Sequence, residues 1–457
     1  MSSAGIPNEK LNKLFLPVLA VIAALPVALI FNDNIWFDEA YTLALIRHSF
    51  GDVIGILKTD MHPPLYFISL KAFCEVFGYS VAVTKLFSVL GFSVMILAGG
   101  FLLKKHFGVL CGLTFALCSA AMPMSFYFSV QQRSYSWTVC FVALCFTEAV
   151  LAVTKGKHLH FVLMALTGLL AAYDHFFGLL AVGIVYAFVN LWLLIKDRRL
   201  FLRALIADGM IIAGYSLWIL PLLSQAGSAA SEFWLNGVEP LSVVIFAASC
   251  VIVFLLLLPK ANRRLETVFA AVCVLSLQAC CLLGTLLVRP FYIGRYSVVI
   301  SGIAACLVAF SAPALGKNAR KTVTVVLCAL FTANFAFSAV FEYQPHIRTF
   351  RERFKAQLGE NDAFLYCDSA FGVMSYYYPD NPHICTFRES WFSAFENVRC
   401  VETDEMLPAV KGADRIWVVK FAQKKFPKEF TDTFTLTKTD EFQNDFNTYE
   451  VYEAVVR

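Results

Sequence analysis

Residues 36–42 of this chain read Trp-Phe-Asp-Glu-Ala-Tyr-Thr, and residues 60–66 read Asp-Met-His-Pro-Pro-Leu-Tyr. Both stretches lie in one polar segment, 32–81, which follows the first long apolar run of the sequence. Acidic residues are scarce elsewhere in positions 1–341, so this concentration marks 32–81 as the place to look for a functional site. The segment holds six of the 14 acidic residues before position 342: Asp33, Asp38, Glu39, Asp52, Asp60 and Glu75.

The composition around this segment is dominated by apolar residues. Of the 457 residues, 59% are hydrophobic and only 15% are charged, and the mean hydropathy is +0.67. A soluble protein carries roughly 25% charged residues, so these few charges cannot coat the three or so soluble domains that the length would allow. The 44 Phe residues and the long apolar runs exclude a disordered chain. The composition therefore predicts a membrane protein, and the net charge of +4 gives no reason to expect a nucleic-acid partner.

Eleven apolar runs are long enough to cross a bilayer, which takes about 20 mostly apolar residues. The sequence therefore predicts an α-helical polytopic membrane protein with about eleven transmembrane helices. The stretch 159–195 has alternative readings, because only Asp174 and His175 divide it. The expected spans are 14–31, 82–103, 108–128, 134–154, 159–175, 177–195, 202–223, 240–258, 265–288, 296–314 and 322–341.

Charged residues separate the chain into two parts. Residues 342–457 hold 33 of the 70 charged residues, 19 acidic and 14 basic, whereas residues 1–341 carry a formal charge of +9. We therefore expect a transmembrane module at 1–341 and a soluble domain at 342–457. A helix-like segment at 347–358 and short apolar strands such as 363–367 and 415–421 predict a small α/β domain. Its expected role is acceptor recognition or, alternatively, that of a solvated stabilising cap.

Lysine and arginine are biased toward alternate short loops, and this bias predicts the orientation. If the N-terminus lies in the cytoplasm, 16 of the 23 basic residues before position 342 lie on the inner side. An odd number of spans then places 342–457 outside, together with the loop 32–81. We expect a multi-pass protein of the plasma or inner membrane with an extracytoplasmic C-terminal domain.

Within the loop, apolar residues recur at helical spacing over 43–57. This pattern predicts one amphipathic helix along the outer membrane surface. Pro63 and Pro64 then predict the start of a second apolar helix, 65–77, which is too short to span.

Asp38 and Glu39 follow the first span closely and have two interpretations. They suit a helix N-terminus, with Asp38 as the cap and Glu39 complementing the helix dipole. Alternatively, a carboxylate in a partly dehydrated site near the headgroups is a usable base. The two interpretations are compatible with each other.

This whole pattern resembles the polytopic GT-C glycosyltransferases, in particular the branch with the protein O-mannosyltransferases and the lipid A aminoarabinose transferase. The resemblance covers roughly residues 10–345. Residues 131–135, Gln-Gln-Arg-Ser-Tyr, resemble the family's Arg-x-Tyr element, and Arg295-Tyr296 resembles its Arg-Tyr. Residues 174–178, Asp-His-Phe-Phe-Gly, resemble its Thr-His-Tyr-Phe-Gly turn, with Asp in place of Thr.

The resemblance implies transfer of a hexose or pentose from a polyprenyl or dolichyl phosphate, with inversion, to a protein, glycan or lipid hydroxyl. The acceptor hydroxyl needs a base, for which we expect Asp38, with Glu39 orienting it or binding hydroxyls. The departing phosphate needs cationic donors. Anchoring in the membrane interface is the alternative for each basic or aromatic candidate. The expected substrate-binding residues are Asp60, His62, Arg133, Tyr135, His175, Arg289, Arg295 and Tyr296.

No cofactor is required by this chemistry, although a divalent metal on Asp38 and Asp60, joined by Glu39 and His62, is a minor alternative. The expected partners are the lipid-linked sugar donor, the acceptor and membrane lipids. A transporter or flippase of lipid-linked saccharides is the competing function. It is disfavoured because the acids gather in one outer loop and no internal repeat is visible.

Two further features carry open alternatives. Asp208 lies inside an expected span and is either functional or paired with nearby Arg203. Cys367, Cys385 and Cys400 belong to the expected outer domain, where one disulfide with a leftover thiol would suit an oxidising compartment.

Overall fold

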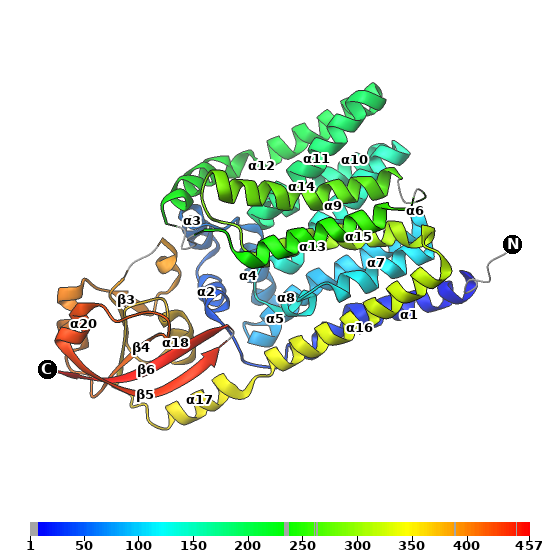
Figure 1. Cartoon of the computed structure of the whole chain (residues 1–457). Helices are drawn as coiled ribbons and strands as arrows, with labels where there is room; N and C mark the ends of the chain where they lie inside the picture. The colour runs from blue at the N-terminus through cyan, green and yellow to red at the C-terminus, as the bar shows by residue number, and fades with distance from the viewer. Residues whose placement is uncertain (1–7, 233–236, 260, 262–263, 388–389, 445) are drawn as a thin grey trace. The chain divides into compact units, whose positions relative to one another are not determined.

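The computed structural model describes residues 8–232, 237–259, 261, 264–387, 390–444 and 446–457. Its chain forms two compact units (Figure 1). The helical unit comprises Met1–Ile30, Met61–Tyr66 and Val83–Ser338, and the mixed unit comprises Phe31–Asp60, Phe67–Ala82 and Ala339–Arg457. The acidic loop of the sequence therefore belongs largely to the same unit as the C-terminal segment, which the charge distribution did not indicate.

Long apolar helices build the helical unit, because apolar runs of this length must satisfy their backbone groups internally. Shorter turns interrupt them at η1 (Leu25–Leu29), η2 (Met95–Gly99), η4 (Gly294–Ile300) and η5 (Ala312–Ala314). The helices are α1 (Asn8–Ala24), α5 (Val81–Val94), α6 (Gly100–Phe107), α7 (Val109–Ala121), α8 (Ser125–Val130), α9 (Tyr135–Lys155), α10 (His158–Asp174), α11 (Phe176–Lys196), α12 (Arg198–Glu232), α13 (Pro240–Leu257), α14 (Leu265–Leu287), α15 (Ser301–Ser311) and α16 (Lys317–Glu342).

Each of the eleven predicted spans falls on one of these helices or on consecutive ones: 82–103 covers α5, η2 and α6, and 108–128 covers α7 and α8. Among the described residues, nine helical stretches are long and apolar enough to cross a membrane. Two shorter apolar helices, α7 and α10, occupy the positions of the two remaining predicted spans. The stretch 159–195 is indeed two helices, which break at His175. The prediction of a polytopic helical membrane protein is confirmed.

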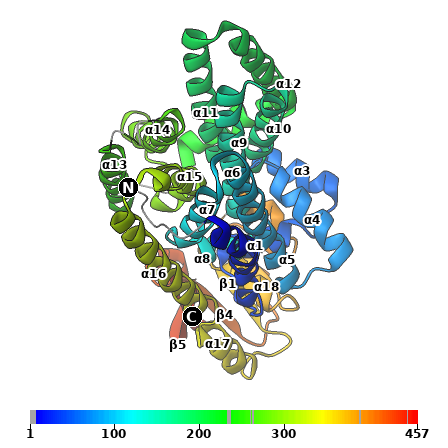
Figure 2. The same ribbon diagram turned by 90° about the vertical axis from the view of Figure 1, so that its right-hand side faces the viewer.

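Helix α9 is the packing centre of this unit, and Figure 2 shows it among its neighbours. It buries 78% of its most apolar stretch and packs against α10, α11 and α15. Small residues permit the close approach: a Cβ atom on Gly302 of α15 would lie 2.6 Å from the Cβ of Ala143 in α9. By contrast, α13 and α16 each bury only 11% and expose apolar side chains, as helices that face lipid do.

Asp208 of α12 pairs with an amide and not with Arg203. Its two carboxylate oxygens accept hydrogen bonds from Nδ2 of Asn190 in α11, at 3.0 and 3.2 Å. Arg203 instead donates to the carbonyl of Gly156. The expectation of an Asp208–Arg203 pair was therefore wrong. Residues five apart on a helix do not share a face, whereas residues three or four apart do.

The mixed unit contains a six-stranded sheet in the order β3-β2-β1-β4-β6-β5. Strands β1 to β4 are parallel, and β6 pairs antiparallel with both β4 and β5. The helix and strands expected at 347–358, 363–367 and 415–421 are present within a few residues. The elements are α17 (Pro345–Lys355), β1 (Ala363–Tyr366), α18 (Phe371–Tyr377), β2 (His383–Cys385), η6 (Ser390–Ala394), β3 (Val398–Cys400), η7 (Thr403–Glu405), α19 (Met406–Val410), β4 (Ile416–Phe421), α20 (Lys428–Thr433), β5 (Phe434–Asn444) and β6 (Asn447–Val456).

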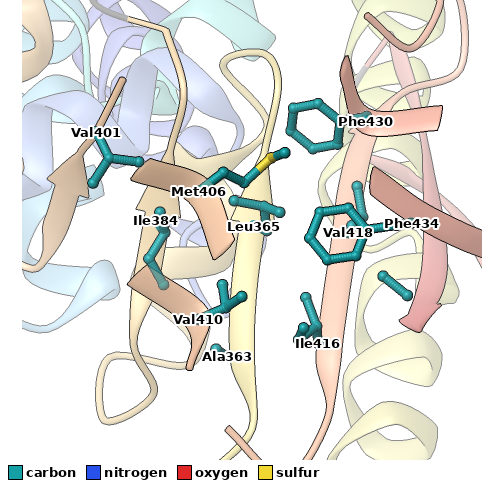
Figure 3. Packing of buried hydrophobic residues seen from close by; sticks show 11 residues of the cluster. Ala363, Leu365, Ile384, Val401, Met406, Val410, Ile416, Val418, Phe430 and Phe434 are labelled. Atoms are coloured by element: carbon teal, nitrogen blue, oxygen red, sulfur yellow. The ribbon is translucent and has the colours of Figure 1, made fainter. Parts of the chain in front are cut away.

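Strands β1, β2 and β4 are buried on both faces, because helices cover each face. On one face, Leu365 of β1 and Val418 of β4 pack with Met406 of α19 and with Phe430 (Figure 3). On the other face, Phe354 of α17 contacts the rings of the alternating residues, among them Trp417 at 5.0 Å between centroids. Because successive side chains of a strand point to opposite faces, the apolar residues form one layer on each side of the sheet.

The loop segment forms three short helices, α2 (Phe37–Leu45), α3 (Phe50–Thr59) and α4 (Leu65–Phe77). The α4 helix matches the prediction for 65–77. The single amphipathic helix predicted over 43–57 was wrong, because the chain breaks between α2 and α3. Ser49 causes the new start, since its Oγ accepts the backbone N–H of Asp52 at 3.2 Å and caps α3.

A buried ion pair makes the stability of the mixed unit depend on pH. The Lys420 ammonium lies 2.6 Å from the Glu450 carboxylate and is almost fully buried. Hydrogen bonds from Lys420 first, and then from Lys438 and Tyr452, hold the pKa of Glu450 at about 2. Because the folded-state pKa is depressed, this pair stabilises the fold above about pH 4.5 and loses its effect as the pH falls toward 2.

We expect Glu450→Gln to lower the unfolding free energy by about 3 kcal/mol at pH 7, since it leaves the buried Lys420 ammonium unpaired. The deficit should shrink as the pH falls from about 4.5 to about 2. Chemical denaturation of the purified protein, followed by tryptophan fluorescence, measures this. Glu441→Gln removes a matched but exposed partner of Lys438 and should cost less than about 1 kcal/mol. Equal stability of wild type and Glu450→Gln at pH 7 would contradict the prediction.

The three cysteines of the C-terminal domain, Cys367, Cys385 and Cys400, are thiols in this structure. Cys385 of β2 and Cys400 of β3 are directly paired in register, and both donate to the carbonyl of Phe387, at 3.3 and 3.5 Å. Neighbouring strands lie about 4.7–4.9 Å apart, which fits the Cα separation of a disulfide. We expect oxidation to join Cys385 to Cys400 and to leave Cys367 alkylatable. Peptide mapping without reductant tests this, and a cross-linked peptide containing Cys367 would contradict it.

Candidate active site

Helix α2 of the mixed unit carries the Asp38–Glu39 pair in its first turn. The N-cap is Trp36, whose backbone is extended (φ −109°, ψ −178°), and not Asp38 as one interpretation expected. Glu39 has the capping role instead, because its carboxylate accepts the backbone N–H of Trp36 at 3.2 Å. The sequence pattern therefore located the helix start but placed the cap two residues late.

The two carboxylates differ in exposure. Glu39 is buried, with 4% of its surface exposed, whereas Asp38 is half-buried. Both lie where the first backbone N–H groups of the helix favour negative charge. The Asp38 side chain is partly accessible, and Glu39 is fixed by its bond to Trp36.

Asp60 ends helix α3 and is buried, with 2% of its surface exposed. Its carboxylate accepts a hydrogen bond from the hydroxyl of Tyr41, which lies on α2. Asp60 therefore ties the carboxylate-bearing helix to the end of α3. Among the residues that the structure describes, no group of three or more His, Cys, Asp or Glu side chains is placed to hold a metal ion.

The helical unit gathers a second set of the predicted residues around Arg133. This arginine lies in the bend between α8 and α9, is 8% exposed, and its Nη2 donates to Nε2 of His62 at 2.6 Å. Gln132 fixes the bend through a 2.6 Å hydrogen bond from its Nε2 to Oγ1 of Thr84. Arg133 and His62 are 71 residues apart in the chain.

His175 lies at the break between α10 and α11, where it caps α11. Its Nδ1 accepts the backbone N–H of Phe177 at 3.1 Å, so the ring proton is on Nε2. Because Nδ1 acts as an acceptor, the ring is neutral and donates only from Nε2.

Aromatic rings line the same region. The ring of His175 lies 5.9 Å from that of Tyr135 and 6.0 Å from that of Tyr296. Phe177 stacks on Tyr296 at 4.5 Å, and the Arg295 guanidinium lies 5.4 Å from the Tyr296 centroid. We call the residues His62, Arg133, His175 and Arg295 the cationic cluster, after the two guanidinium groups, Arg133 and Arg295, whose charges act on the neutral ring of His175.

Phe177 was not singled out among the candidate residues, although the 174–178 motif contained it. Asp174, from the same motif, is buried and accepts a 2.5 Å hydrogen bond from Oγ1 of Thr138, which fixes the end of α10 beside α9. Arg289 lies in the turn between α14 and η4, where its backbone N–H donates to the carbonyl of Gly284.

No protein-family model matches the sequence, and no curated protein matches it. The structure is similar to two crystal structures of ArnT from Cupriavidus metallidurans, one in the apo state and one bound to undecaprenyl phosphate. Their TM-scores are 0.68 and 0.65 at 12% and 11% identity, over 96% of this chain and 97% of ArnT.

A third similar structure is the oligosaccharyltransferase of Archaeoglobus fulgidus, tethered to an acceptor peptide. The match has a TM-score of 0.50 and 12% identity, and it covers 94% of this chain and 74% of that one. Both proteins are GT-C enzymes. The chain described here, with its polytopic helices and its small C-terminal sheet, therefore has the GT-C fold.

Proposed function

We propose that this protein is a membrane glycosyltransferase that moves a hexose or pentose from a polyprenyl-phosphate donor to an acceptor hydroxyl, with inversion. The observation that carries the proposal is the cationic cluster on a GT-C fold, in which Arg133 is buried and the other three residues are half-buried. Of the structurally similar proteins, ArnT binds undecaprenyl phosphate and the oligosaccharyltransferase holds an acceptor peptide. The acceptor here is a protein, glycan or lipid hydroxyl on the outer face of the membrane.

The cationic cluster suits a departing phosphate. When the bond between the sugar C1 and the phosphate oxygen breaks, negative charge grows on that oxygen, and donors already in place stabilise it without reorganisation. Arg133 is held by His62, and a guanidinium presents paired donors that match a phosphate. Arg295 adds a second guanidinium to the same region.

The neutral ring of His175 supplies a different kind of contact. A protonated Nε2 donates one hydrogen bond without adding charge, which suits a sugar hydroxyl or a phosphate oxygen. Tyr135 and Tyr296 flank the ring and offer apolar surfaces to a sugar. These residues bind and orient the donor, and no proton transfer is required of them.

Asp38 is the proposed general base. The acceptor hydroxyl attacks C1 of the sugar as its proton passes to the Asp38 carboxylate, the C1–oxygen bond to phosphate breaks, and the polyprenyl phosphate leaves as an anion. One displacement of this kind inverts the anomeric carbon. Glu39 stabilises the first turn of α2 through its hydrogen bond to the backbone of Trp36. The reaction balances without a metal ion.

The proposal also includes an orientation of the chain in the membrane. We place the N-terminus in the cytoplasm, because basic residues occupy the alternate short loops on that side. Helices α2 and α3, which carry Asp38, Glu39 and Asp60, then lie outside the cytoplasm, as does the sheet domain. Labelling of introduced single cysteines with a membrane-impermeant reagent tests this placement, and labelling of a cysteine at position 10 in intact cells would overturn it.

Product analysis tests the function itself. The purified protein is incubated with a panel of polyprenyl-phosphate sugars and membrane extract, and the products are identified by mass spectrometry. We expect one donor to be consumed and one acceptor to gain the mass of its sugar. If no donor is consumed and a labelled lipid-linked saccharide shows counter-flow in proteoliposomes, the protein is a transporter instead.

A further inference from the structure

The backbone segment just before α2 is held by side chains from the C-terminal part of the mixed unit. Tyr377, the last residue of α18, uses its hydroxyl twice: it accepts the N–H of Ile35 at 3.1 Å and donates to the carbonyl of Asp33 at 2.9 Å. Asn444, the last residue of β5, donates from Nδ2 to the carbonyl of Ile35 at 2.6 Å. Both backbone polar groups of Ile35 are therefore bound by side chains 342 and 409 residues away.

Other contacts reinforce this attachment. The Arg351 guanidinium lies 4.2 Å from the centroid of the Tyr377 ring and 3.9 Å from the carboxylate of Asp33. Burial raises the pKa of Tyr377, so its hydroxyl keeps its proton and remains a donor. A Cβ atom on Gly372 of α18 would lie 2.8 Å from the ring of Phe37, the first residue of α2. The segment 33–37 is thus fixed at several points.

We propose that Tyr377 and Asn444 are positioning residues for the Asp38–Glu39 helix. The clamped residue Ile35 is three positions before Asp38, and Trp36 between them is the N-cap of α2. Because the first turn of a helix follows its N-cap, the two bonds to Ile35 fix the position of the backbone that carries the Asp38 side chain. The C-terminal domain then has a role in catalysis itself, in place of acceptor recognition or a passive cap.

The catalytic consequence rests on the function proposed above, in which Asp38 is the base. Tyr377→Phe removes both hydrogen bonds of the hydroxyl and keeps the ring under Arg351. We expect kcat to fall about 10- to 100-fold, because a displacement of about 1 Å at the reacting groups has effects of that size. The KM for the lipid donor should stay within about twofold of wild type. Tyr376→Phe is the matched control, since in the described part of the chain that hydroxyl makes no hydrogen bond to 33–36, and it should leave kcat unchanged.

A double-mutant comparison separates positioning from general damage. In an Asp38→Asn background, Tyr377→Phe should cause no further loss of the residual rate, because the group that it positions is already gone. An additive loss, an unchanged kcat in Tyr377→Phe, or an equal loss in Tyr376→Phe would overturn the inference. A raised KM with normal kcat would also overturn it, since it would make Tyr377 a substrate-binding residue.

Hydrogen exchange tests the attachment without any activity. The amide of Ile35 should exchange at least about tenfold faster in Tyr377→Phe than in wild type, whereas Asn444→Ala, which frees only the carbonyl of Ile35, should have a smaller effect. Tyr376→Phe should leave exchange unchanged. If wild type transfers no sugar yet the exchange responds, the proposed function fails and the attachment stands. If wild type transfers sugar and neither exchange nor kcat responds, the positioning role fails.

Discussion

Asp38→Asn should abolish sugar transfer, with turnover reduced by at least about 100-fold and by up to about 10⁴-fold. The amide has nearly the same shape as the carboxylate but cannot accept the acceptor's proton, and general-base catalysis contributes effects of this size. Asp38 is half-buried in the first turn of α2, and its replacement leaves the bond between Glu39 and Trp36 in place. The protein should therefore fold normally and still bind the donor.

Transfer of radiolabelled sugar by the purified variant measures this effect. Asp52→Asn is the matched control, because Asp52 is an exposed acid in the same loop, at the start of α3, and should retain nearly full activity. Binding of undecaprenyl phosphate, followed by thermal shift, should be the same in both variants. Normal turnover in Asp38→Asn would remove the role assigned to this residue.

Arg133→Gln should lower kcat/KM by about 10²- to 10³-fold, the usual effect of removing one preorganised donor from developing charge. Arg133 is buried and fixed by its 2.6 Å hydrogen bond to His62. Glutamine keeps much of the side-chain length and loses the charge. Arg133→Lys should recover only part of the activity, because an ammonium keeps the charge but loses the planar fork.

Steady-state kinetics with a varied concentration of the lipid donor measure this loss. Affinity for undecaprenyl phosphate should fall in parallel, because the same cation would bind the released product. Arg199→Gln, at the exposed start of α12, is the control and should not change either quantity. If Arg133→Gln keeps wild-type kcat/KM, the cationic cluster does not bind the departing phosphate.

The sequence by itself determined the helices and strands that form because of residues close to one another in the chain. All eleven apolar runs became helical, because an apolar run of bilayer length has to satisfy its backbone internally wherever it lies in the fold. The strands at 363–367 and 415–421 and the helix at 65–77 were also predicted, since apolar run length, Gly or Pro boundaries and helical periodicity are visible in a few residues. The family-like motifs singled out His62, Arg133 and His175 as candidates, each by itself.

The tertiary structure decided which of these residues meet. Nothing local indicates that Arg133 bonds to His62, that Asp208 faces Asn190, or that Tyr377 and Asn444 hold Ile35 across 342 and 409 residues. Such contacts depend on how helices and strands pack, and a residue's neighbours in space are set by that packing. The sequence therefore showed which chemical groups are present, and the packing of distant segments determined their partners and their orientation.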